Sequence, residues 1–161
     1  MDIIEIYTDG SSLGNPGPGG YGIVMKYKGI RKTASKGFEK TTNNRMELMA
    51  VIDALRLLND AARDKEIHIY SDSKYVIDAV EKKWVFGWEK KGFKDKKNAD
   101  LWRQFLNKYP FHKIVFHWVK GHSGVPENEV CDQLAKKAAE GPELKIDHGY
   151  IKSITPGQTL L

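Results

Sequence analysis

The sequence predicts an α/β fold in which a five-stranded mixed sheet is flanked by helices. The first observation is a strand pattern that ends in an aspartate and occurs twice, at Ile4–Asp9 and at Ile67–Asp72. The second is a β-hairpin pattern between the two copies, and the third is the alternation of helical and strand patterns in the rest of the chain. Three meandering strands followed by crossover connections are typical of a mixed sheet.

The first three predicted strands form an antiparallel meander. Ile4–Asp9 alternates apolar and polar side chains, which indicates a strand. Residues 10–20 are too rich in glycine and proline for a helix or a strand. Strand patterns then cover residues 20–27 and 30–38, and Lys28 and Gly29 form the turn between them.

Helices and two further strands complete the predicted domain. Helices are predicted at residues 45–58, 73–83, 100–106 and 127–140, with strands at 67–72 and 114–119. Right-handed crossovers from the central strand give the strand order 3-2-1-4-5. We expect residues 1–142 to form a single domain. The polar segment 143–161 is expected to be a loosely attached tail.

Composition sets limits on the class of protein. The chain has 161 residues, of which 40% are hydrophobic and 29% are charged, as in ordinary globular domains. No apolar run approaches the ~20 residues that a membrane helix needs. The N-terminus carries no signal segment, and the single cysteine, Cys131, cannot form an internal disulfide. We therefore expect a cytoplasmic protein.

Positive charge is concentrated in residues 82–97. The net charge is +5, and this segment, which contains seven lysines and two acids, carries the whole excess. Trp84, Phe86, Trp88 and Phe93 lie between the lysines, and glycines interrupt the segment, so a helix–turn excursion is predicted. A localised basic patch indicates a polyanionic partner. The alternative is a surface helix whose rings pack into the core.

Two aspartates end the repeated strands. If the two strands pair in parallel, Asp9 and Asp72 lie side by side at the carboxyl edge of the sheet, where open α/β sheets place their sites. Adjacent carboxylates repel, so that either one is protonated or a cation lies between them. A strand-end aspartate is also a common turn or capping residue.

Two helical acids join this pair. Glu47 precedes an apolar stripe at the start of the 45–58 helix and therefore points inward, although an acid there also suits the helix dipole. Asn128 and Asp132 share one face of the last helix. Four acids without a Cys or His cluster favour Mg²⁺ or Mn²⁺ over Zn²⁺. Two such ions support phosphodiester cleavage, and His122, in a glycine-flanked loop, could transfer a proton or simply be solvated.

Four stretches resemble one known family. TDGSSLGNPGPGG, TTNNRMEL, YSDSKYV and KGHSGVPENEVCDQLA, in this order and spacing, are similar to bacterial type 1 ribonuclease H over residues 1–150. The resemblance implies a ribonuclease H-like fold. It also implies an endonuclease that hydrolyses the RNA strand of RNA–DNA hybrids with two Mg²⁺ ions, Mn²⁺ being a substitute, and leaves 5′-phosphate and 3′-hydroxyl ends. We expect a monomer without membrane contact.

The resemblance also implies site residues. The catalytic and metal-binding acids are Asp9, Glu47, Asp72 and Asp132, and the catalytic histidine of the mobile loop is His122. Asp9 would bridge both ions. Asp132 would complete the site of the ion that activates water, and Glu47 and Asp72 would hold the ion at the leaving group. The nucleic-acid contacts fall on Asn15, Thr42, Asn43, Asn44, Lys74, Lys83, Trp84, Lys90, Lys91, Lys94, Lys96 and Asn128.

Two departures from the family pattern concern nucleic-acid contacts. Lys74 replaces a glutamine that is frequent two places after the third acid. The basic protrusion, residues 82–97, is shorter on its C-terminal side than in the best-known bacterial members. Two alternatives remain: a hybrid-binding module without turnover, and a DNA nuclease or transposase of the same fold. The complete set of acids argues against the first, and the Thr42–Asn44 and His122 stretches argue against the second.

Overall fold

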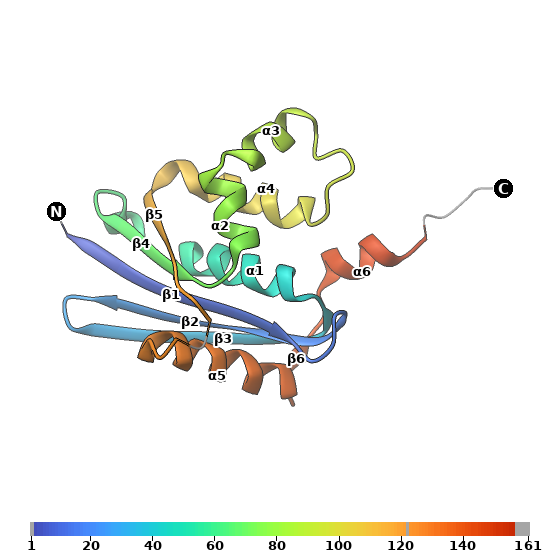
Figure 1. Cartoon of the computed structure of the whole chain (residues 1–161), viewed down its shortest axis with the longest axis horizontal. Coiled ribbons are helices and arrows are strands. Elements are labelled where there is room, and N and C mark those ends of the chain that lie inside the picture. The colour runs from blue at the N-terminus through green and yellow to red at the C-terminus, as the bar shows by residue number, and fades with distance from the viewer. Residues whose placement is uncertain (1, 122, 157–161) are drawn as a thin grey trace.

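A six-stranded mixed sheet forms the centre of the protein (Figure 1). The computed structural model describes residues 2–121 and 123–156. The strand order is β5-β4-β1-β2-β3-β6, so the predicted order is confirmed and one strand is added at the β3 edge. The strands are β1 (Ile3–Ser12), β2 (Gly17–Tyr27), β3 (Ile30–Thr41), β4 (Glu66–Ser71), β5 (Lys113–Trp118) and β6 (Leu144–Lys145).

The expected meander and crossovers are present, but the prediction that residues 10–20 contain no strand is wrong, because β1 continues to Ser12 and β2 begins at Gly17. Pairing between these two strands extends through Ser12 and Gly19, so the backbone ladder overrides the glycine-rich composition. β1 pairs with β2, and β2 with β3, in antiparallel orientation, whereas β4 pairs in parallel with both β1 and β5. The helices are α1 (Asn43–Arg56), α2 (Lys74–Glu81), α3 (Trp84–Lys90), α4 (Ala99–Lys108), α5 (Pro126–Glu140) and α6 (His148–Ile154). Short 3₁₀ turns follow α1 and α4, at Asp60–Ala62 and Tyr109–Phe111.

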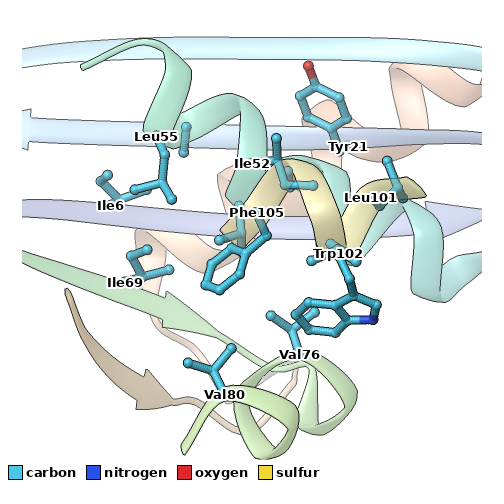
Figure 2. Close-up of a cluster of buried hydrophobic side chains, with 14 of the residues drawn as sticks. Ile6, Tyr21, Ile52, Leu55, Ile69, Val76, Val80, Leu101, Trp102 and Phe105 are labelled. Atoms are coloured by element: carbon cyan, nitrogen blue, oxygen red, sulfur yellow. The ribbon is translucent and has the colours of Figure 1, made fainter. Parts of the chain in front are cut away.

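Helices cover both faces of the sheet. Figure 1 shows α1 to α4 on one side and α5 on the other. The main core lies under α1, where side chains of β1, β4, α1, α2 and α4 meet (Figure 2). Trp102 and Phe105 of α4 are fully buried there against Ile6 and Ile69 of the sheet. A smaller cluster, Tyr7, Val24 and Cys131, lies beneath α5.

The helix starts follow local capping chemistry. The Thr42 side chain accepts a hydrogen bond from the Arg45 amide at 3.3 Å, and the Ser73 side chain accepts one from the Val76 amide at 3.2 Å. Pro126 occupies the first turn of α5, where a missing N–H costs nothing. These caps fix the starts of the helices at the same sheet edge that carries the strand-end aspartates.

The C-terminal segment differs from the loose tail that the sequence predicts. β6 pairs in parallel with β3, with Gly37 opposite Leu144. Asp147 is 4% exposed, caps α6 and accepts hydrogen bonds from Arg45 at 2.8 and 2.9 Å and from Thr41 at 2.7 Å. The sequence pattern looked polar and loose because a two-residue strand and a buried acid leave no periodic signal.

The basic excursion combines the two interpretations that the sequence left open. Val85 and Phe93 are buried, and Phe86 and Trp88 pack against the core, so most of the apolar side chains face inward. Trp84 is 48% exposed. All seven lysines of residues 82–97 are exposed. The segment is therefore a folded protrusion with a basic outer surface.

Candidate active site

The parallel pairing of β1 and β4 brings two aspartates to one sheet edge. Tyr7 lies opposite Tyr70 in the register. Asp9 and Asp72 each follow two residues later, where the pairing of β1 with β4 has ended. Asp72 comes directly after β4, whereas Asp9 lies within β1, which continues to Ser12 beyond the end that the sequence predicts. Asp9 is 6% exposed and Asp72 is partly buried. The sequence repeat therefore reflects two neighbouring strands that deliver a carboxylate to the same point.

Gly10 allows α1 to approach this edge. A Cβ atom at Gly10 would overlap the backbone of Met46 and Glu47, so only glycine fits. The Gly10 amide donates hydrogen bonds to Asp9 Oδ1 at 2.9 Å and to Glu47 Oε1 at 3.1 Å. Glu47 points inward, as its position on the apolar stripe predicts, and is 8% exposed.

Three carboxylates converge. Asp9, Glu47 and Asp72 each contribute one oxygen to a group whose members lie within 4.8 Å of one another. Glu47 Oε2 is buried and has no hydrogen-bond partner among the described residues. Burial raises the pKa of Asp9 to about 7, and repulsion from Asp72 and Asp132 adds to this rise. Burial and the neighbouring acids likewise hold the pKa of Glu47 well above its usual value.

Asp132 lines the same cavity without belonging to this close group. Its side chain is 23% exposed and forms an ion pair with Lys136 at 3.1 Å. Close packing of α5 on the sheet positions it. A Cβ atom at Gly22, which pairs with Asp9, would overlap the Cys131 carbonyl, and the Cys131 thiol donates to the Tyr7 carbonyl at 3.2 Å.

The acids line a cavity of about 430 Å³ at the sheet edge. Other lining residues are Gly10, Ser11, Asn43, Asn44, Ser73, Lys74, Tyr75 and Lys136. Sequence reasoning missed Ser11, Ser73, Tyr75 and Lys136. The i, i+4 spacing of Lys136 from Asp132 was an available signal, whereas the other three lie next to or near identified residues without a pattern of their own.

The predicted nucleic-acid contacts surround this cavity in part. Asn43 Oδ1 accepts from the Ser12 amide at 2.7 Å, and Asn15 Oδ1 accepts from the Asn43 amide at 3.1 Å, so these two residues also join the glycine-rich loop to α1. Asn44 is exposed in the cavity wall, and Thr42 caps α1. Asn128 is 5% exposed, and its Oδ1 has no hydrogen-bond partner among the described residues.

Lys74 connects the cavity to the neighbouring surface. It lines the cavity, and its Nζ lies 4.6 Å from the centre of the Trp118 ring. Lys74 also borders a second hollow, which Trp84, Trp88 and Lys96 of the protrusion line. The candidate residues Lys83, Lys90, Lys91, Lys94 and Lys96 are exposed on the protrusion but do not line the acidic cavity.

His122 lies outside the described residues. The preceding residue, Gly121, lies against the acidic group, because a Cβ atom added to it would be 3.0 Å from Asp72 Oδ2. Gly121, the neighbour of His122 in the sequence, therefore lies beside the Asp72 carboxylate.

Comparisons with known proteins agree with this geometry. The family model described as RNase H matches residues 1–140. The chain is 52% identical over 149 residues to the ribonuclease H of Desulforamulus reducens, covering 89% of this chain and 92% of that protein. It is 50% identical over 152 residues to the ribonuclease HI of Vibrio parahaemolyticus, covering 91% and 96%.

Solved structures show the same fold. LC9-RNase H1, described as a type 1 RNase H with the type 2 active-site motif, matches with a TM-score of 0.78 and 30% identity over 97% of this chain and 82% of that one. LC11-RNase H1 in complex with RNA/DNA hybrid matches with a TM-score of 0.64 and 26% identity over 85% and 96%. The chain therefore belongs to the ribonuclease H family, as its resemblance to the bacterial type 1 enzymes indicated.

Proposed function

We propose that the Asp9–Glu47–Asp72 group, together with Asp132, hydrolyses the RNA strand of RNA–DNA hybrids and leaves 5′-phosphate and 3′-hydroxyl ends. The observation that carries this proposal is the convergence of three carboxylate oxygens within 4.8 Å at the sheet edge. Such a group of buried acids is unfavourable unless protons or cations neutralise it. A module that only bound nucleic acid would need the lysines of the protrusion but not this cluster.

The donor set suits divalent cations. All candidate ligands are carboxylate oxygens, which Mg²⁺ and Mn²⁺ prefer, and buried Glu47 Oε2 has no donor among the described residues. We infer that Mg²⁺ is the working ion and that Mn²⁺ replaces it. When bound, a pair of such ions supplies the activation of water and the charge stabilisation at the departing 3′-oxygen.

The protein residues divide this task. Asp9 would contribute to both ion positions, as the resemblance to the type 1 enzymes implies, and both Asp72 and Asp132 are close enough to raise its pKa. Glu47 and Asp72 would hold the ion on the leaving-group side, and Asp132 would hold the ion on the side of the attacking water. Glu47 also accepts a hydrogen bond from a ribose 2′-hydroxyl, the group that distinguishes RNA from DNA. We assign proton transfer to and from the reacting oxygens to His122.

The surrounding polar groups bind the duplex. We infer that Thr42, Asn43 and the start of α1 contact backbone phosphate, since helix N-termini bind anions. Asn15, Asn44, Lys74 and Asn128 contact the hybrid around the cavity. In the protrusion, Lys83, Trp84, Lys90, Lys91, Lys94 and Lys96 hold the duplex through its phosphates.

Cleavage of an end-labelled RNA–DNA hybrid tests the activity directly. We expect cleavage of the RNA strand with Mg²⁺ and with Mn²⁺, none with EDTA, and product ends that carry 5′-phosphate and 3′-hydroxyl groups. Tight binding without products would instead identify a binding module. Equal cleavage of duplex DNA in the same assay would identify a DNA nuclease or transposase.

Three further expectations concern the whole chain. We propose a single catalytic domain over residues 1–142, with the protrusion at 82–97. We propose that the chain works as a monomer, since all four acids come from one chain; light scattering coupled to size exclusion tests this.

No described helix is long and apolar enough to span a membrane, and Cys131 is a free, buried thiol. We propose a cytoplasmic location, which imaging of a tagged chain would test.

A further inference from the structure

A pair of histidines occupies the sheet away from the carboxylate site. His68 of β4 and His117 of β5 belong to adjacent parallel strands, and Nδ1 of His68 lies 2.7 Å from Nε2 of His117. The ring centres are 4.8 Å apart and the ring planes are inclined by 23°, so the contact between the two nitrogens is the shortest link between these side chains. Neighbouring residues Ile67 and Ile69 face the main core. The histidines therefore lie on the opposite face.

A carboxylate fixes the protonation of this pair. Glu66 Oε1 lies 2.6 Å from Nε2 of His68 and thus accepts the proton that this nitrogen carries. Nδ1 of His68 then has a lone pair, which accepts the proton on Nε2 of His117. A histidine that binds a metal through one ring nitrogen usually donates a hydrogen bond from the other nitrogen to a carboxylate or a carbonyl.

Stacked rings hold His117 in position. Tyr70 lies 4.5 Å from the His117 ring, and Tyr7 lies 4.6 Å from Tyr70, so three rings follow one another across β5, β4 and β1. These distances match the spacing between strands. Tyr70 supports the His117 ring on one side, and the pair is reachable because the side chains of His68 and Glu66 are 15% and 33% exposed.

We propose that His68 Nδ1 and His117 Nε2 bind one borderline transition-metal dication, of the Zn²⁺, Ni²⁺ and Cu²⁺ class. The proton on Nε2 of His117 moves to Nδ1 of the same ring through solvent, so that both facing nitrogens offer lone pairs. Two ligands about 2.0–2.1 Å from an ion at a tetrahedral angle are about 3.3 Å apart, so the two nitrogens, which lie 2.7 Å apart, separate by roughly 0.6 Å as the rings turn. Water fills the remaining positions.

This site is distinct from the carboxylate site in position and chemistry. His68 precedes Asp72 by four residues on one strand, which corresponds to about 13 Å. Imidazole nitrogens suit Zn²⁺, Ni²⁺ and Cu²⁺, whereas Mg²⁺ prefers the oxygens of the acidic group. The proposal therefore stands independently of the catalytic assignment.

Titration calorimetry with Zn²⁺, in excess Mg²⁺, tests this site. We compare the wild-type chain with His68→Gln, His117→Gln and the control His148→Gln, which removes an exposed histidine of α6. The first two variants should weaken Zn²⁺ binding at least tenfold, and the control should leave it unchanged. Glu66→Gln keeps the hydrogen bond but loses the charge, and should weaken binding by about tenfold. Glu66→Gln replaces the histidine variants in the test if circular dichroism shows that they do not fold.

Electron paramagnetic resonance of bound Cu²⁺ separates the two kinds of site. Two imidazole ligands should give the hyperfine splitting of two nitrogens in the wild type and in His148→Gln, and His117→Gln should reduce it to the splitting of one nitrogen at most. An oxygen-only spectrum in the wild type would overturn the proposal. So would equal Zn²⁺ affinity in the wild type, His68→Gln and His117→Gln. Either result would leave the pair as a hydrogen bond between β4 and β5.

Discussion

At the scale of single residues, one backbone amide joins two of the four acids. The Gly10 amide donates to both Asp9 and Glu47, which draws a strand end and a helix start to the same point. This single donor only partly compensates two buried carboxylates, and the pKa of Asp9 remains near 7. The fold therefore holds the site in an unfavourable charge state, which a bound cation would relieve.

Asp9→Asn should abolish turnover while preserving the fold. The substitution removes the carboxylate that we propose both ion positions share, and we expect kcat to fall by about 1,000-fold or more. Steady-state cleavage of the hybrid measures this loss, with circular dichroism as a check of folding. The control is Asp60→Asn, whose side chain is 92% exposed and which should retain full activity. Near-normal kcat for Asp9→Asn would refute the assignment.

The convergence of three of the acids could be predicted from the sequence, because each follows a rule of local structure. Asp9 and Asp72 close the same phrase in two neighbouring strands, and Glu47 lies on the apolar stripe of its helix. The close packing partners had no such signal. Three residues border the cavity only because of where α2 and α5 lie against the sheet, namely Ser73, Tyr75 and Lys136. No local sequence pattern specifies that placement.

At the scale of elements, glycines determine how closely α5 packs. Cβ atoms at Gly20, Gly22 and Gly37 would each overlap a backbone carbonyl of α5, so β2 and β3 offer a smooth surface to the helix. Because Gly22 pairs with Asp9 and contacts Cys131, this contact sets the distance from Asp132 to the other acids.

Gly22→Ala should therefore impair both stability and activity. The added methyl group forces α5 away from β2, at a cost of about 1–3 kcal/mol for overpacking, which corresponds to a fall in Tm of roughly 5 °C. We expect kcat to fall as Asp132 moves. Calorimetry and the cleavage assay measure the two effects. Gly87→Ala, where a Cβ atom meets nothing within 4 Å, should leave kcat unchanged and should raise Tm slightly, because Gly87 lies inside helix α3. Unchanged kcat in Gly22→Ala would mean that α5 tolerates the displacement.

The protrusion is an element whose charge faces outward while its rings face inward. Changing Lys90, Lys91, Lys94 and Lys96 to Gln should raise KM for the hybrid about tenfold and flatten its salt dependence, because fewer phosphates are neutralised. The slope of log KM against log salt should fall by about 1 for each lysine that contacts a phosphate. KM measured across a salt series gives both values.

A control variant with the same change in net charge tests whether the position of the lysines in the protrusion matters. Changing the exposed residues Lys32, Lys113, Lys137 and Lys152 to Gln also removes four charges, but none of these lies in the protrusion. This control should alter KM much less. Equal effects of the two variants would show that net charge, and not the protrusion, governs binding.

At the scale of the whole molecule, the order of the first five strands could be predicted from their connectivity. The attachment of β6 and α6 to the rest of the fold could not. Handed crossovers predicted β5-β4-β1-β2-β3. β6 and α6 are instead held by a buried ion-pair network, in which Arg45 contacts Asp147 at 2.8 Å and Asp100 at 2.7 Å. These partners are 102 and 55 residues from Arg45, so only the assembled fold reveals them.

Asp147→Ala should destabilise the whole fold. Arg45 is 2% exposed, and removing one partner of a buried ion pair costs about 3–5 kcal/mol. We expect Tm to fall by about 10 °C in thermal denaturation. Asp64→Ala, which breaks the surface pair with Lys65, should change Tm by no more than a degree or two. A small change for Asp147→Ala would mean that the C-terminal segment adds little to stability.

Stability should respond jointly to pH and to divalent ions. Because the pKa of Asp9 is about 7 in the folded chain and near 3.8 when unperturbed, the native state binds more protons between these values. Unfolding free energy from this group therefore falls as pH rises from 4 to 7, and Glu47 acts in the same direction. Mg²⁺, which binds the deprotonated group, should raise Tm by several degrees at pH 8 and hardly at all at pH 5.

Asp9→Asn isolates this contribution from other titrating groups. In EDTA at pH 8 the variant should be more stable than the wild type, because it lacks a repelled charge, and this advantage should shrink as pH falls toward 4. Its Tm should also gain less from Mg²⁺. Thermal denaturation of both proteins at pH 5 and 8, with Mg²⁺ or EDTA, gives all four comparisons. If Mg²⁺ raised Tm equally at both pH values, or equally in both proteins, the ion would be stabilising the chain at a place other than this carboxylate group.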